Sequence, residues 1–146
     1  MGFGEAVAKF YTGYFRFEGR ASRSEYWWPF LMRAVINVGM LVAFIAMFVM
    51  TGAGDEPEGT FLTGFIGLLI AYLLFNLFNF IPTLAISVRR FHDLDQTGWL
   101  VLVFVLINAF FIVTVFAQLI WYALRGTDGP NQYGPDPLGF NPELFG

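Results

Sequence analysis

The stretch that decides the fold of this chain is the short polar segment Ser87-Val88-Arg89-Arg90-Phe91-His92-Asp93-Leu94-Asp95-Gln96-Thr97-Gly98-Trp99, which separates two long apolar runs. It holds two of the eight Lys and Arg residues and the single histidine of the chain. Polar and ionisable groups flanked by apolar runs are costly unless they have a role in structure or function. We therefore expect any chemistry of this protein to centre on residues 87–99.

The composition around this segment indicates a membrane protein. Of the 146 residues, 57% are hydrophobic and only 13% are charged, whereas soluble domains carry about 25% charged residues. A soluble core of this size cannot bury so much apolar surface, which predicts lipid as the solvent. The net charge of -3 gives no basic field for nucleic acid. The absence of cysteine excludes disulfides, thiolate metal sites and thiol nucleophiles.

The hydropathy pattern predicts an all-α integral membrane protein with three transmembrane helices, at about 28–50, 61–86 and 99–124. Phe3, Val7, Phe10 and Tyr14 share one helical face, so a short amphipathic helix lying in the membrane surface is expected first. The predicted regions are this helix with a cytoplasmic basic motif (1–26), the three-helix membrane domain (27–125) and an extended Gly/Pro-rich tail (126–146).

Local signals place the start of the first long helix and its orientation. Ser22 and Glu25 have the spacing of a capping box, which begins a helix. Four basic residues precede the first span, none lies in the loop at 51–60, and Arg89 and Arg90 follow the second span. The positive-inside rule then predicts a cytoplasmic N-terminus, a cytoplasmic 87–99 segment and, after three spans, a periplasmic C-terminus.

Polar and small residues within the spans indicate how the helices pack. Asn76, Asn79 and Thr83 form one polar face of the second span, which favours hydrogen bonds between helices or, alternatively, a polar cleft for a ligand. Asn108, Thr114 and Gln118 in the third span are suited to bond with that face. Small-xxx-small pairs, which allow close helix contact, occur at Gly39 with Ala43 and at Gly67 with Ala71.

The 87–99 segment offers little for catalysis. His92, Asp93 and Asp95 could ligate a metal, but further histidines are missing, so we expect no metal and no cofactor. His92 with Asp93 could form an acid–base pair, yet no nucleophile accompanies it. We therefore expect no enzyme activity.

The charged residues of the two polar segments instead predict a network at the cytoplasmic surface. Glu25 and Asp93 are expected to pair with arginines, because guanidinium groups match carboxylates bidentately. The same residues are the candidates for binding lipid headgroups. The candidate set is Arg20, Arg23, Glu25, Arg89, Arg90, His92 and Asp93.

Three motifs carry a resemblance to a known family. They are Phe17-Glu18-Gly19-Arg20-Ala21-Ser22-Arg23-Ser24-Glu25-Tyr26-Trp27-Trp28, Ser87-Val88-Arg89-Arg90-Phe91-His92-Asp93 with Gly98-Trp99, and Gly126-Thr127-Asp128-Gly129-Pro130-Asn131-Gln132-Tyr133-Gly134-Pro135-Asp136-Pro137. In this order they resemble the domain of unknown function 805 (DUF805) family of small bacterial inner-membrane proteins. Gln96 and Gln132 stand where family members often carry a basic residue, and Asp95 stands where glycine is frequent. The 87–99 segment is therefore less cationic than the family pattern, which weakens a role in binding an anion.

The resemblance implies the bacterial inner (plasma) membrane and supplies no function. Packing edges and ordered polar ends favour an accessory or scaffolding subunit on a larger membrane complex. The alternative is a lipid- or small-molecule-binding or transport protein that acts as an oligomer. The expected partners are membrane lipids and other membrane protein subunits, without nucleic acid.

Overall fold

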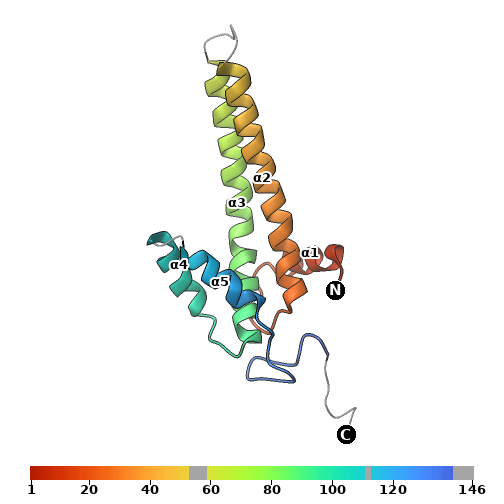
Figure 1. The fold of residues 1–146 in the computed structure, drawn as a ribbon. Coiled ribbons are helices and arrows are strands. Elements are labelled where there is room, and N and C mark those ends of the chain that lie inside the picture. The colour runs from red at the N-terminus through yellow and green to blue at the C-terminus, as the bar shows by residue number, and fades with distance from the viewer. Residues whose placement is uncertain (53–58, 111–112, 140–146) are drawn as a thin grey trace. The chain divides into compact units, whose positions relative to one another are not determined.

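The computed structural model describes residues 1–52, 59–110 and 113–139. Within these ranges the chain is helical, apart from turns and one isolated bridge between Asn131 and Gly134. Figure 1 shows the helices α1 (Phe3–Thr12), α2 (Arg23–Gly52), α3 (Thr60–Asp93), α4 (Leu100–Phe110) and α5 (Val113–Ala123). The chain divides into two compact units, one made of Met1–Pro29 with Ile81–Gly146 and the other of Phe30–Phe80.

The unit Phe30–Phe80 is an antiparallel pair formed by the long parts of α2 and α3 (Figure 1). The rings of Phe44 and Phe65 lie 5.7 Å apart, and Asn76 Nδ2 donates to Asn37 Oδ1 at 3.1 Å. Asn76 therefore makes a hydrogen bond between helices, the first of the two roles predicted for it. Asn79, by contrast, is fully buried and donates to the Phe75 carbonyl of its own helix at 2.8 Å.

Two described helices, α2 and α3, are long and apolar enough to cross a membrane. Their 30 and 34 residues reach roughly 45 and 51 Å at 1.5 Å per residue, beyond the ~30 Å hydrocarbon core. The most apolar stretch of each is not buried inside the protein, unlike the core helix of a soluble domain. The predicted spans at 28–50 and 61–86 fall within these helices.

The predicted third span is wrong. Residues 99–124 contain α4 and α5, and their 11 residues each reach only about 16 Å. Asn108 Nδ2 donates to Gln118 Oε1 at 2.7 Å, although ten residues of continuous helix would separate them by about 15 Å. Thr114 also donates to Asn108. These polar groups bond to one another between α4 and α5, instead of reaching the second span as expected.

The two-span fold also changes the expected position of the tail. The prediction of a periplasmic C-terminus, on the opposite side of the membrane from the N-terminal motif, required three spans. Instead, Arg20 donates to the carbonyls of Gly129 and Thr127 at 2.5 and 2.6 Å, so the tail lies with that motif. Residues 140–146 of the predicted tail, and residues 53–58 of the predicted acidic loop, lie outside the described residues.

The N-terminal helix and the start of α2 follow the sequence signals in part. The helix α1 buries Ala6 and Phe10 in its own unit, while Phe3 stays exposed and Tyr14 lies beyond the helix end. Its expected place in the membrane surface remains a prediction. Ser22 Oγ accepts a hydrogen bond from the Glu25 amide at 3.3 Å, as an N-cap of α2 does.

Candidate functional site

Five charged residues meet in the interior of the unit that contains both polar motifs. We call this set the arginine network, and it consists of Arg20, Glu25, Arg89, Arg90 and Asp93. The segment between α1 and α2, the first turn of α2 and the last turn of α3 each contribute to it. All five residues are buried. Unpaired charges in such a place would cost several kcal/mol each, so the partners of each group decide whether the unit folds.

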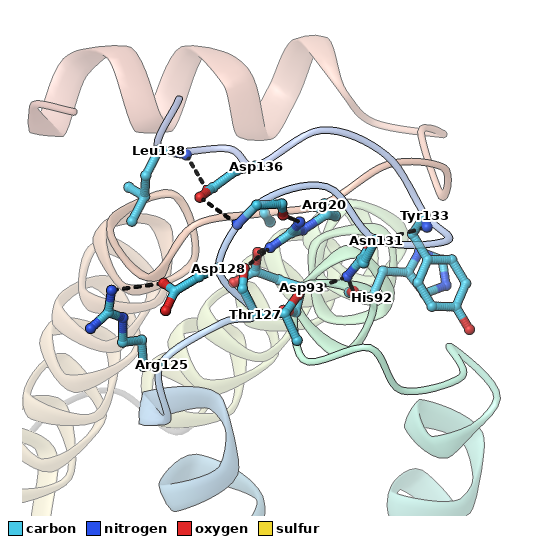
Figure 2. Close-up of polar contacts among 12 residues, drawn as sticks. Arg20, His92, Asp93, Arg125, Thr127, Asp128, Asn131, Tyr133, Asp136 and Leu138 are labelled. Atoms are coloured by element: carbon cyan, nitrogen blue, oxygen red, sulfur yellow. Dashed lines mark hydrogen bonds and ion pairs between the residues drawn. The ribbon is translucent and has the colours of Figure 1, made fainter. Parts of the chain in front are cut away.

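Asp93 is the carboxylate shared by two arginines, Arg20 and Arg90. Figure 2 shows its contact with Arg20. Arg20 Nε and Nη2 lie 3.0 and 2.9 Å from Asp93 Oδ1. Arg90 Nη1 donates to Asp93 Oδ2. One carboxylate therefore neutralises part of the charge of two buried guanidinium groups, and it joins the N-terminal motif to the end of α3.

Arg90 has the largest completely buried side chain among the described residues. Its Nε donates to the Tyr122 carbonyl at 2.9 Å and its Nη2 donates to the Leu124 carbonyl. These carbonyls belong to the last turn of α5 and the residue beyond it, where helical partners are missing. Nη1 also donates a hydrogen bond to the Ala21 carbonyl at 3.4 Å. Arg90 thus caps α5 and holds three segments of the chain together.

Arg89 faces the other carboxylate of the network. Its Nη1 donates to Glu25 Oε1 at 2.7 Å, and both side chains are buried. Helix α2 is therefore tied to α3 through its first turn. Arg23 is exposed at the start of α2, and no ion pair joins it to Glu25 or Asp93 in the described part of the chain.

His92 packs against the tail and not against Asp93. Its ring stacks on Tyr133 with centroids 3.9 Å apart, and its Nδ1 lies 3.1 Å from the Gly19 carbonyl (Figure 2). Asn131 donates to the His92 carbonyl at 2.9 Å. The acid–base pair considered from the sequence is thus not assembled, because Asp93 faces Arg20 and Arg90. No group of three potential metal ligands occurs among the residues that the structure describes.

The sequence reasoning missed the part played by the tail and by α5. The sequence predicts only an extended Gly/Pro-rich tail, yet the Thr127 amide donates to the Asp93 carbonyl at 2.9 Å. Tyr122 packs its ring 5.1 Å from that of Phe91, and burial raises the pKa of its hydroxyl, which favours the protonated form. The sequence signal that could have indicated the role of the tail is the polar, turn-rich motif at 126–137, whose side chains are suited to hydrogen bonding.

Gly126 gives a direct test of how tightly Asp93 is held. A Cβ built on Gly126 would collide with the Asp93 carboxylate, which Arg20 and Arg90 keep from moving away. Gly126→Ala should therefore lower the free energy of unfolding in detergent by about 1–3 kcal/mol. The matched control is Gly4→Ala, because no atom lies within 4 Å of a Cβ there. Equal stability of both variants would show that the Asp93 carboxylate is free to shift.

Comparison with known proteins agrees with the motif pattern. A family model described as protein of unknown function (DUF805) matches residues 14–135. The inner membrane protein YhaI of Escherichia coli K12 is 35% identical over 135 residues, covering 90% of this chain and 92% of YhaI. The inner membrane protein YhaH of the same strain is 32% identical over 131 residues, with the same coverage of each chain. No solved structure matches. The chain therefore belongs to the DUF805 family, whose matched relatives are proteins of the inner membrane.

Proposed function

We propose that this protein is an accessory or scaffolding subunit that packs on a larger complex of the inner membrane and performs no catalysis. The observation that carries the proposal is a pair of exposed small-residue edges on the two long helices. A polar unit cross-linked by buried ion pairs accompanies these edges. A unit held together by buried ion pairs and a pair of long apolar helices suit the docking and positioning of other subunits.

The small-residue edges are not packed against any other part of the described chain. Gly39 and Ala43 on α2 are exposed, as are Gly67 and Ala71 on α3. A Cβ added at Gly39 or Gly67 would meet no atom within 4 Å. At Gly64, by contrast, it would lie 2.7 Å from Met47 Sδ, so the α2–α3 contact already uses that glycine. In lipid, exposed small residues allow the close approach of another helix.

The chemistry of the arginine network supports a structural role over catalysis. Arg20 and Arg90 use their donors on Asp93 and on backbone carbonyls. His92 is stacked on Tyr133 without a carboxylate to orient it. The basic residues favour a cytoplasmic face for the N-terminal motif and residues 87–99. The tail then lies on that face, because it bonds to Arg20.

A second candidate is the binding of a lipid or another apolar molecule by an oligomer. A cavity of about 550 Å³ in the unit Phe30–Phe80 favours it, lined by Asn37, Val38, Leu41, Phe44, Phe65, Leu69 and Tyr72. Its size is that of ordinary ligand sites. The polar cleft that the sequence offers as an alternative, on the face of Asn76, Asn79 and Thr83, differs from this cavity, because none of these three residues lines it.

The test is gentle detergent extraction of the tagged protein from its native membrane, with mass spectrometry of co-purifying proteins. The wild type should carry a stoichiometric membrane complex. Gly39→Leu with Gly67→Leu should lose the complex yet keep the melting temperature, because both glycines are exposed and a Cβ at either position meets no atom within 4 Å. Leu73→Phe is the control, an exposed residue roughly 120° around α3 from Gly67.

Two outcomes would reject the accessory role. One is a wild-type protein that purifies as a homo-oligomer with a bound lipid and no other subunit, which would favour the second candidate. The other is a double variant that retains the whole complex, since the small-residue edges would then not be the docking surface.

A further inference from the structure

We propose that the cavity beside Arg89 binds a single phosphate group of a phosphate-bearing ligand. The cavity has a volume of about 310 Å³ and lies within the unit that holds the arginine network. The lining residues that matter below are Lys9, Gly13, Arg16, Glu25, Arg89 and Asp136. Helix α1, the segment after it, the two motifs and the tail all contribute. The proposal does not depend on the accessory role.

The lining of the cavity is cationic. Four of its side chains are Lys or Arg and two are carboxylates. Lys9 and Arg16 are exposed, whereas Arg89 is buried. A phosphate in this cavity would thus meet solvent-accessible cations and a desolvated guanidinium, where an ionic hydrogen bond is stronger than in water.

The donor edge of Arg89 is the feature that points to a ligand. Arg89 is only 4% exposed, and its Nη1 is bonded to Glu25. Its Nε and Nη2 have no hydrogen-bond partner among the residues that the structure describes. These two nitrogens form one side of the guanidinium fork, the geometry that receives two oxygens of a phosphate or carboxylate. A buried charged donor without a partner is unfavourable, so a ligand anion there would be stabilising.

Gly13 lies against this buried donor edge. A Cβ on Gly13 would stand 3.4 Å from Arg89 Nη2 and 2.9 Å from the Lys9 carbonyl oxygen. Both Gly13 and Arg89 line the cavity. A side chain at this position would therefore crowd Nη2, so glycine is the residue that leaves this edge least obstructed.

The two carboxylates of the lining are already engaged. Glu25 binds Arg89 through Nη1, on the side away from the unpartnered edge. Asp136 Oδ1 accepts the Leu138 amide at 2.8 Å and Oδ2 accepts the Gly129 amide at 3.4 Å. Neither carboxylate therefore competes for the Nε and Nη2 donors of Arg89.

The ligand class follows from this donor set and from the membrane setting. A tetrahedral phosphate can accept the Arg89 fork with two oxygens and turn the others toward Lys9 and Arg16. The volume matches a small headgroup and a few waters, each water occupying about 30 Å³. The phosphate belongs either to a phospholipid headgroup or to a soluble phosphate-bearing solute.

Calorimetric titration of the full chain in a neutral detergent tests the site. The probes are dihexanoyl phosphatidylglycerol, dihexanoylglycerol as the same chains without phosphate, and inorganic phosphate. Saturable binding of the phosphatidylglycerol alone would identify a headgroup site. Binding of inorganic phosphate that competes with it would identify a site for soluble phosphate groups. Both results support the proposal, and dihexanoylglycerol should not bind.

Variants then locate the site. Arg16→Gln should weaken binding about fivefold, the effect of one basic residue near anionic headgroups. Glu25→Gln with Arg89→Gln removes the fork without leaving a buried charge and should weaken binding on the order of thirtyfold. The control Arg125→Gln removes an exposed cation that pairs with Asp128 outside the cavity, and it should bind as the wild type does.

Three results would overturn the proposal: no saturable binding of either phosphate probe, equal weakening by Arg16→Gln and Arg125→Gln, or full binding by the folded double variant. If that double variant does not fold, Lys9→Gln with Arg16→Gln decides. Both residues are exposed on the cavity. Wild-type affinity in that pair would reject the site.

Discussion

Asp93→Ala is expected to lower the free energy of unfolding by about 3–5 kcal/mol, the usual cost of removing one partner from a buried ion pair. The Asp93 carboxylate serves the guanidinium groups of Arg20 and Arg90, and all three side chains are at most 6% exposed. Both arginines would keep their carbonyl partners but lose their counter-charge. The measurement is unfolding by SDS titration from a mild detergent, followed by tryptophan fluorescence.

The matched control is Asp128→Ala, which removes a carboxylate that also pairs with an arginine three residues away. The Arg125–Asp128 pair is mostly exposed, so its loss should change the stability by no more than about 0.5–1 kcal/mol. If Asp93→Ala cost no more than this control, the buried network would not be what holds the polar motifs together.

The place of the network could be predicted from the sequence, but its pairing could not. Charged residues in two polar segments at lipid boundaries had to meet if those segments share a face. Neighbouring Arg89 and Arg90 have the same chemistry, however, and only the helical rotation of α3 decides which one faces Glu25. In the structure Arg89 pairs with Glu25, whereas Arg90 pairs with Asp93 and donates to a carbonyl in the last turn of α5.

The two long helices were predictable because length and hydropathy alone define them. The same criteria failed at 99–124, since a hairpin of α4 and α5 has the hydropathy of one span. The side chains of Asn108, Thr114 and Gln118 join α4 to α5 by hydrogen bonds. Their side-chain partners depend on tertiary structure, and hydropathy does not contain that information.

The tail illustrates the same limit. Its Gly and Pro content correctly predicted turns, and one bridge joins Asn131 to Gly134. Its order arises from backbone carbonyls of Thr127 and Gly129 that accept from Arg20. Every residue has a backbone carbonyl, so no sequence pattern marks which ones an arginine will bind.

Arg90→Lys should destabilise the unit by roughly 2–5 kcal/mol even though it keeps the positive charge beside Asp93. The Arg90 guanidinium serves Asp93 and the carbonyls of Tyr122 and Leu124 from a single planar group. A lysine ammonium is a point charge and cannot span these acceptors from one position. Each buried carbonyl left without a donor costs about 1–3 kcal/mol.

The distinguishing measurement for Arg90→Lys is amide hydrogen exchange combined with the SDS titration. Because the carbonyls that lose their donor lie at the end of α5, exchange should accelerate first around residues 122–131. Arg125→Lys, at an exposed pair, should leave both stability and exchange close to those of the wild type. Wild-type stability in Arg90→Lys would mean that charge alone holds the end of α5, and that the directional bonds from the guanidinium contribute little.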